Sequence, residues 1–190
     1  MLVEGPLDEA AAAKIIQSTG QEPGDCYGKK GCAVIRDNFK KFNGAARVSP
    51  YLAMVDSMDT GLPCPPLIVT TWLPQRNPQM LFRVVVRELE SWLLADRESI
   101  ADFLKISVVK VPLNPEILPD PKQQLVNLAR KSRSKSIRDA LVPAKGSTAQ
   151  VGKLYTSEIT NFILNYWNPT QARSASPSLD SCLTRLTELE

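Results

Sequence analysis

Short apolar segments alternate with helical segments over residues 1–104, and this alternation constrains the fold of the chain more than any other feature. The clearest pair is Leu81–Arg87, which is rich in β-branched residues, followed by Glu88–Leu104, whose apolar residues recur at helical spacing. Leu2–Val3 and Tyr51–Val55 are further apolar segments that end in acidic residues. Strands that alternate with helices form parallel sheets covered on their faces. The sequence therefore predicts an α/β fold with a mostly parallel sheet covered by helices.

Weaker patterns supply the remaining elements. We expect strands at Cys32–Arg36 and Val108–Val111, a loop at Gly20–Gly31, and helices or helical turns at Asp8–Gln17, Phe39–Ala46 and Leu67–Trp72. Beyond a proline-rich turn at Pro112–Pro121 we expect only helices, at Gln123–Ser132, Ser136–Leu141, Val151–Trp167 and Ser178–Leu189. Residues 1–111 are thus predicted to form an α/β core, and residues 112–190 a helical C-terminal extension packed on the same domain. The first strand has only the residues before Glu4, whereas strands usually have ~5–6 residues. This suggests an incomplete or misassigned N-terminus.

The composition excludes several classes of chemistry. The chain contains no histidine, so Ser-His-Asp and Cys-His catalysis and histidine-based zinc sites are excluded. The four cysteines form no Cys-x-x-Cys pair, and we interpret them as reduced thiols of a cytoplasmic protein. No apolar run approaches the ~20 residues that span a bilayer, so no membrane partner is expected.

Acidic residues follow three of the predicted strands. Glu4 follows the first, Asp56 and Asp59 follow Tyr51–Val55, and Glu90 lies just beyond Leu81–Arg87. Because binding sites form at the carboxyl ends of parallel strands, these acids are expected to converge. Like charges ~4 Å apart repel strongly, and a divalent cation relieves the repulsion; oxygen ligands alone favour Mg²⁺ or Mn²⁺. The alternative is that such acids only cap helices and form turns, which suits Asp8 and Asp59.

Two of these acidic motifs resemble those of TOPRIM domains. Leu2-Val-Glu4-Gly5 followed by Asp8 is similar to the family's opening motif, in which a strand delivers a glutamate before a glycine. Met54-Val-Asp56 followed by Asp59 is similar to its second motif, although the family's aspartates are separated by one residue and here by two. The wider spacing makes the role of Asp59 less certain than that of Asp56.

Most of the chain resembles a bacterial family known as domain of unknown function 4276. The central resemblance is Arg87-Glu88-Leu-Glu90-Ser-Trp92-Leu-Leu-Ala-Asp96-Arg97, and Leu118–Lys122, the Ser/Arg run through Arg138, Val151–Tyr155 and Ser176–Leu179 are further parts of it. The resemblance implies a TOPRIM-like fold and a gene often found beside an AAA or ABC-type ATPase in phage-defence systems.

The chemistry implied by the resemblance is Mg²⁺-dependent phosphoryl transfer, most plausibly by a nuclease. We expect Glu4 and Asp56 to be catalytic, and the metal ligands to be Glu4, Asp56, Asp59 and Glu90. The main alternative is a TOPRIM-like module that binds or regulates an ATPase without catalysis; a third is an enzyme acting on a small phosphorylated ligand.

A basic segment suggests contact with a nucleic-acid backbone. The predicted contacts are Arg130, Lys131, Arg133, Lys135 and Arg138, together with Arg87 at a strand end. The alternatives are a solvated helix surface for the segment and, for Arg87, an ion pair with Glu88 or Glu90. For Trp92 and Asp96 we favour a core position and a structural anchor, respectively.

Overall fold

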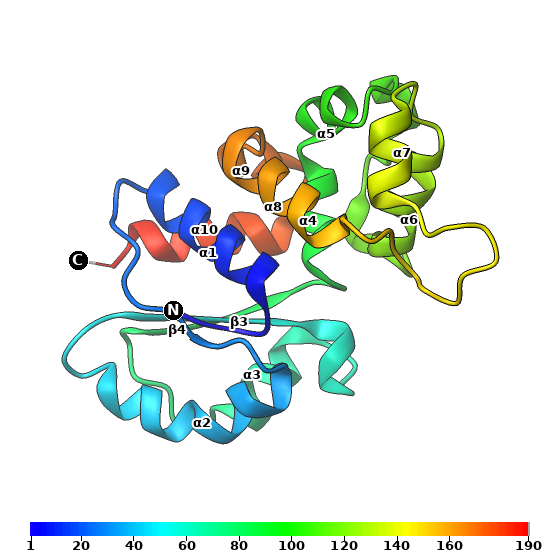
Figure 1. Cartoon of the computed structure of the whole chain (residues 1–190). Coiled ribbons are helices and arrows are strands. Elements are labelled where there is room, and N and C mark those ends of the chain that lie inside the picture. Colours follow the sequence, from blue (N-terminus) through cyan, green and yellow to red (C-terminus); the bar gives the residue numbers. More distant parts are fainter. Residues whose placement is uncertain (190) are drawn as a thin grey trace.

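The structure, a computed structural model, describes residues 1–189 (Figure 1). Within these residues a single sheet of parallel strands has the order β2 (Tyr27–Gly28), β1 (Leu2–Val3), β3 (Tyr51–Asp56) and β4 (Met80–Val85). In the register of the sheet, Leu2 lies opposite Ala53, and Val55 opposite Val84. The predicted α/β class with a parallel sheet is therefore confirmed. The order places the strands that deliver the predicted acidic residues, β1, β3 and β4, side by side.

Helices cover both faces of this sheet. They are α1 (Pro6–Ser18), α2 (Cys32–Ala45), α3 (Pro65–Trp72), α4 (Leu89–Ala95), α5 (Arg97–Phe103), α6 (Pro121–Arg130), α7 (Lys135–Leu141), α8 (Tyr155–Asn165), α9 (Pro169–Ala172) and α10 (Pro177–Thr187), with 3₁₀ turns η1 (Ser57–Thr60), η2 (Val108–Lys110), η3 (Pro115–Ile117) and η4 (Arg173–Ala175). Figure 1 shows α2 and α3 below the sheet, and α1, α10 and most of the C-terminal helices above it. Within residues 1–189 we find no helix whose length and hydrophobicity would allow it to cross a lipid bilayer.

The alternation of side chains along β3 explains why both faces are covered. Leu52 and Met54 belong to a buried cluster that also contains residues of α1, α4 and the C-terminal helices. Ala53 and Val55 belong to a second cluster formed with α2 and α3. A strand that is apolar on both sides must be buried on both sides, which is the usual condition of a parallel sheet. The upper cluster joins residues from the first half of the chain to residues of the helical C-terminal part.

The predicted strand at Cys32–Arg36 is wrong, because this segment forms the beginning of α2. Ile35, Phe39 and Phe42 are buried and recur at the spacing of one helical face. This period extends well beyond the short β-branched stretch on which the prediction depended. Packing of that face against the sheet decides the conformation.

The predicted strand at Val108–Val111 is also wrong. Val108–Lys110 is a 3₁₀ turn, and Val109 is exposed. The side chain of Arg97 donates hydrogen bonds to the carbonyl oxygens of Val108 and Val111, each at 3.2 Å. A local turn closed by a guanidinium group thus takes the place of a strand that would need a neighbour in the sheet.

The long helix predicted at Glu88–Leu104 is divided into α4 and α5 at Asp96. The carboxylate of Asp96 accepts a hydrogen bond from the backbone N–H of Ser99 at 3.3 Å and so caps α5. Its second oxygen accepts a hydrogen bond from the N–H of Asn168 at 2.8 Å. Asp96 is therefore a structural anchor, as the sequence indicated.

Gly152 allows the segment before α8 to lie directly against the end of α7. A Cβ atom at this position would lie 2.2 Å from the carbonyl oxygen of Ala140 and 2.6 Å from the carbonyl carbon of Leu141. The N–H of Gly152 donates to the carbonyl oxygen of Leu141 at 2.9 Å. The close approach fixes the position at which α8 begins, at Tyr155.

We expect Gly152→Ala to lower the free energy of unfolding by about 1–3 kcal/mol, because the added methyl group meets rigid backbone atoms. Urea denaturation monitored by circular dichroism measures this change. The control is Gly44→Ala in α2, where a Cβ has open space and alanine favours the helix by up to ~1 kcal/mol. Equal effects of the two changes would contradict the close packing at Gly152.

Candidate functional site

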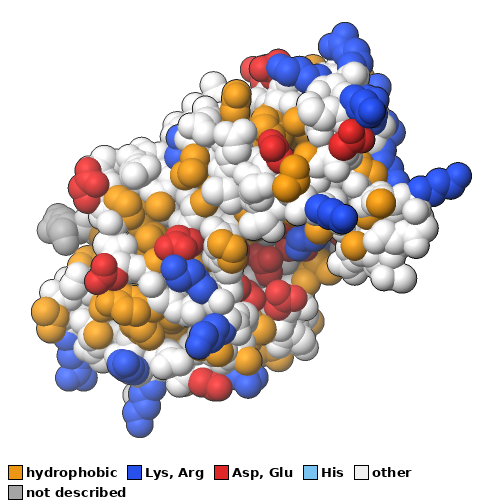
Figure 2. All heavy atoms as spheres, in the orientation of Figure 1, with side chains coloured by type: hydrophobic (Ala, Val, Ile, Leu, Met, Phe, Trp, Pro, Cys, Tyr) orange, Lys and Arg blue, Asp and Glu red, His pale blue; other side chains and the backbone are white. Residues whose placement is uncertain are grey.

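The carboxyl ends of three adjacent strands bring acidic side chains together. Glu4 directly follows β1, Asp56 is the last residue of β3, and Glu88 and Glu90 follow β4. Parallel strands all end at the same edge of the sheet, so the strand order alone places these residues near one another. Figure 2 shows acidic side chains gathered in a hollow between the lower part of the molecule and the upper, C-terminal helices.

Glu4 and Asp56 are in direct contact. The Oε1 atom of Glu4 accepts a hydrogen bond from the backbone N–H of Asp56 at 2.8 Å. Burial raises the pKa of Glu4 to about 7; the bond from Asp56 opposes this rise, and the nearby charges of Asp59 and Asp8 add to it. The structure therefore brings the first strand's glutamate to the two aspartates that follow β3.

Asp56 carries an unpartnered oxygen. Among residues 1–189, no donor forms a hydrogen bond with Asp56 Oδ1, and this atom is inaccessible to solvent. Burial raises the pKa of Asp56 well above its ordinary value, and the charges of Asp8, Glu90 and Glu4 raise it further. A buried polar atom without a partner costs about 1–3 kcal/mol, so the site gains stability from any cation or donor that reaches this oxygen.

Asp8 is a member of the same group that sequence reasoning assigned to helix capping. It lies in the first turn of α1, whose N-cap residue is Gly5. Burial raises the pKa of Asp8 to about 6, although backbone hydrogen bonds and the charge of Lys122 act in the opposite direction. The charge of Asp8 in turn raises the pKa values of Glu4 and Asp56. Asp8 could have been assigned to this group from the sequence, because it belongs to the same Leu2–Asp8 motif as Glu4.

Asp59 lies on η1, at the rim of the group. Its side chain is exposed, and its charge raises the pKa values of Glu4 and Asp8. The thiol of Cys32 donates a hydrogen bond to the carbonyl oxygen of Asp59 at 3.1 Å, which ties the turn to the start of α2. The two residues between Asp56 and Asp59 belong to η1, which leads from the strand end to an outer position near Glu4.

Glu90 is fully buried and is held by two residues from the C-terminal part. The hydroxyl of Tyr155 donates to Glu90 Oε1 at 2.8 Å, and the ammonium group of Lys122 lies 3.6 Å from Oε2. Burial raises the pKa of Glu90, while Lys122 lowers it. Both oxygens of Glu90 thus have partners within the protein. Its predicted role as a supplementary metal ligand stays a prediction.

Lys122 supplies positive charge inside the acidic group. Its ammonium group donates to Glu88 Oε2 at 2.8 Å, and its backbone N–H donates to Glu88 Oε1 at 2.7 Å. Burial acts to lower the pKa of Lys122, but the charges of Glu90 and Glu88 outweigh it and hold the pKa above its ordinary value. Lys122 is therefore charged at neutral pH.

Sequence reasoning did not assign Lys122 and Tyr155 to the site. Lys122 belongs to the segment Leu118–Lys122 and Tyr155 to the segment Val151–Tyr155, both of which carry the resemblance described above. The presence of both residues in these segments was the feature of the sequence that could have assigned them to the site. Their approach to Glu90 depends on long-range packing, which local patterns do not contain.

The donors present fit a hard cation in part. Among residues 1–189, no three histidine, cysteine, aspartate or glutamate side chains are arranged to hold a metal ion together. Asp56, however, has an unpartnered buried oxygen, and Glu4 lies against it. Oxygen donors without nitrogen or sulfur suit Mg²⁺ or Mn²⁺. Glu4 and Asp56 are the residues that would hold such an ion, with Asp59 and Asp8 beside them.

Arg87 lies two residues beyond the end of β4. It has a positive φ of 67°, and its carbonyl oxygen accepts a hydrogen bond from the N–H of Met58 at 3.1 Å. Its side chain is exposed, whereas the salt bridges of Glu88 and Glu90 in the described part of the chain are formed with Lys122. The alternative of an ion pair between Arg87 and one of these acids is therefore absent from residues 1–189.

Trp92 belongs to the core, as the sequence indicated. It is fully buried, and its indole N–H donates to Ser178 Oγ at 2.7 Å. Glu116 Oε1 in turn accepts a hydrogen bond from the same hydroxyl group at 2.6 Å. These bonds join α4 to α10 and to η3, and they hold the helices that close the upper side of the site.

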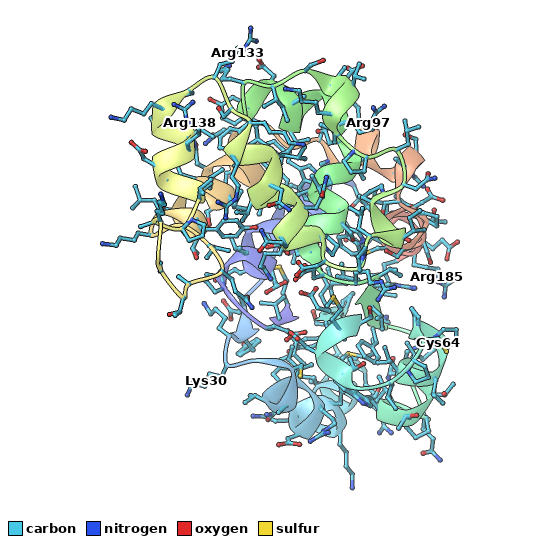
Figure 3. The ribbon with its side chains drawn as sticks, turned by 90° about the vertical axis from the view of Figure 1, so that its right-hand side faces the viewer. Lys30, Cys64, Arg97, Arg133, Arg138 and Arg185 are labelled. Atoms are coloured by element: carbon cyan, nitrogen blue, oxygen red, sulfur yellow. The ribbon has the colours of Figure 1, made fainter. Side chains whose placement is uncertain are left out.

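The predicted nucleic-acid contacts lie mainly on the outer surface of the C-terminal part. Arg130, Lys131, Arg133 and Lys135 are exposed, at the end of α6 and the start of α7. Arg138 is half-buried, and one of its guanidinium nitrogens donates to the carbonyl oxygen of Ser132. Figure 3 shows Arg133 projecting into solvent and Arg138 on the same side of the molecule as the loop between α7 and α8.

Comparisons of this chain with family models, with curated proteins and with solved structures found no match. The resemblance to TOPRIM domains and to domain of unknown function 4276 stays a prediction.

The pKa shifts of Glu4 and Asp8 predict how stability depends on pH in a metal-free buffer. Both pKa values are higher in the folded chain than their ordinary values of 4.5 and 3.8, so the folded chain binds more protons than the unfolded chain between about pH 4 and pH 7. The free energy of unfolding should therefore fall as the pH rises through this window. Denaturant titrations at several pH values measure the fall.

Glu4→Gln should reduce this fall by about 1 kcal/mol, a value that allows for the partial solvent exposure of the group. The control is Glu98→Gln on α5, whose side chain is exposed. Curves of Glu4→Gln and wild type that run parallel over the whole window would refute the crowding of acids around Glu4.

Proposed function

We propose that this chain is a Mg²⁺- or Mn²⁺-dependent phosphoryl-transfer enzyme, and specifically a nuclease-like effector that cleaves nucleic acid. The observation that carries the proposal is the unpartnered, buried Oδ1 of Asp56, a residue whose backbone N–H donates to the carboxylate of Glu4 at the end of the adjacent parallel strand. Acids crowded in this way need positive charge, and the single ammonium group of Lys122 faces at least Glu88, Glu90, Asp56 and Asp8. The site is therefore suited to bind one more cation.

A divalent cation in such a site neutralises phosphate charge and lowers the pKa of attacking water. Glu4 and Asp56 would hold such an ion, and the carboxylate of Glu4, whose pKa is raised to about 7, would be the group to accept or give a proton. Asp59, exposed at the rim, is the acid of this group most accessible to a substrate. Lys122 holds Glu88 and Glu90 in place, so that the edge of β4 keeps its position when the charge of the site changes.

The charges around the site support a nucleic-acid backbone as the substrate. Arg87 is exposed next to the strand ends, and the exposed cations of α6 and α7 lie further along the C-terminal part. Contacts of this kind address phosphates and carry no sequence information. Binding without sequence preference and with strong salt dependence follows. The proposed ATPase partner and the link to phage defence are supported by the resemblance alone.

The position of Lys122 favours a second function, that of a module that binds a partner without catalysis. Its ammonium group lies 2.8 Å from Glu88 and 3.6 Å from Glu90, so the protein already places one positive charge in the acidic group. A module that kept this fold and bound its ATPase partner without catalysis would need no further ion. The response to divalent cations separates the two functions.

Divalent cations should raise the melting temperature of the purified chain by a few degrees at neutral pH, because the ion binds the folded state alone. Asp56→Asn should remove most of this rise, whereas Glu98→Gln, on an exposed position of α5, should keep it. Differential scanning calorimetry with Mg²⁺, Mn²⁺ and EDTA measures the effect. A melting temperature that does not respond to either cation would select the non-catalytic module.

Cleavage of single-stranded and duplex DNA and RNA should require Mg²⁺ or Mn²⁺, and Glu4→Gln or Asp56→Asn should lower the rate by at least 10²-fold. Gel analysis of labelled oligonucleotides measures the rate, with nucleotides tested in parallel as small phosphorylated ligands. Cleavage that persists in EDTA, or that survives both substitutions, would remove the proposal.

A further inference from the structure

A second feature of the C-terminal part stands apart from the acidic group. A cavity of about 780 Å³ lies between the end of α6, α7 and the segment that leads to α8, and its lining contains Arg130, Arg138, Lys145, Lys153 and Asp139. Four positive charges and one negative charge give this lining a net charge of +3, as large as the net charge of the whole chain. The basic character of the protein is thus concentrated in one concave region.

The cations of this cavity are not neutralised by acids. Within residues 1–189, no salt bridge involves Arg130, Arg138, Lys145 or Lys153. Arg138 donates one hydrogen bond to the carbonyl oxygen of Ser132, which positions its guanidinium group without cancelling its charge. Concave walls of low polarity strengthen the field of such charges, and this favours the binding of an anion.

The basic lining residues come from two parts of the chain, which we call the two walls of the cavity. Arg130 and Arg138 come from α6 and α7, whereas Lys145 and Lys153 come from the segment between α7 and α8, which protrudes from the side of the molecule in Figure 1. The sequence reasoning assigned the first wall to nucleic-acid contacts and assigned nothing to Lys145 and Lys153. Cations from two separate parts of the chain can each contact a phosphate of a bound strand.

The lining residues also indicate what the cavity does not recognise. Apart from the charged residues, the lining consists of Val142, Pro143, Ala144, Ser147, Ala149 and Val151. None of these residues is aromatic, so the cavity offers no ring on which a base could stack. Its chemistry addresses phosphate groups.

The groove is connected to the acidic group through two elements. Lys122 lies at the start of α6 and Arg130 at its end, roughly 12 Å apart along the helix axis. Lys153 precedes Tyr155, whose hydroxyl donates to Glu90. Helix α6 thus carries a residue of the acidic group at its start and a residue of the cavity at its end.

We propose that this groove binds the phosphates of a nucleic-acid strand through Arg130, Arg138, Lys145 and Lys153. The proposal rests on the proposed nuclease function for its substrate class, and it adds Lys145 and Lys153 as the residues of the second wall. Binding by the groove needs no divalent ion and no cleavage, so it can be measured on its own.

The test is the affinity of the full chain for a labelled single-stranded oligonucleotide in EDTA, measured by fluorescence anisotropy over a range of salt concentrations. The double change Lys145→Glu and Lys153→Glu should weaken binding at least tenfold. It should also lower the slope of log Kd against log salt concentration by about 1.4, since two phosphate contacts of a single strand are lost. Both lysines are exposed, so the fold should tolerate the change.

The matched control is Lys40→Glu with Lys41→Glu. These lysines are exposed on α2, on the opposite face of the sheet, and the control makes the same change in net charge. Equal weakening by the two double variants would overturn the groove, and so would the absence of binding by the wild-type chain. A nucleoside triphosphate that competes at the same concentration as the oligonucleotide would overturn the assignment to a strand.

The experiments can refute the proposed nuclease function and the proposed phosphate-binding groove independently of each other. An oligonucleotide that binds in EDTA and weakens as expected supports the groove even where no cleavage occurs with Mg²⁺. Cleavage that depends on Glu4 and Asp56 but is unaffected by the lysine variants leaves the acidic site standing and removes the groove.

Discussion

The repulsion among carboxylates at the end of the sheet is the constraint on which the rest of the structure depends. β1, β3 and β4 lie side by side and end at one edge, so Glu4, Asp56 and Glu90 cannot avoid one another. The energy of like charges at short range in a partly buried site is several kcal/mol, which is a large fraction of the stability of a domain. This repulsion is reduced by raised pKa values of Glu4 and Asp56, by hydrogen bonds to the carboxylates and by the ammonium group of Lys122.

The C-terminal helices supply the groups that balance this charge. Lys122 from α6 pairs with Glu88, and Tyr155 from α8 donates to Glu90. The same two helices border the basic groove at the end of α6 and before α8. The helical part of the chain therefore has two roles: it covers the upper face of the sheet, and it places positive charge within the acidic group and in the basic groove.

The sequence predicted the parts of the fold that local periodicity determines. The strands at β3 and β4 and the convergence of Glu4 and Asp56 followed from apolar runs that end in acids, together with the geometry of parallel sheets. The segment at Cys32–Arg36 was wrong because a short β-branched stretch looks like a strand until its wider helical period is counted. β2 was not predicted because it has two residues, one of them glycine. Lys122 and Tyr155 escaped it because they contact Glu90 across 32 and 65 residues of sequence, respectively, and such contacts depend on how helices pack.

The central claim is that Glu4 and Asp56 together bind a divalent cation. The most direct measurement is a crystal structure of the chain grown with Mn²⁺, with anomalous difference density used to locate the ion. We expect a peak in coordination contact with Asp56 Oδ1 and with the carboxylate of Glu4, on the side of the group that faces Asp59. Crystals saturated with Mn²⁺ that show no peak at these oxygens would contradict it.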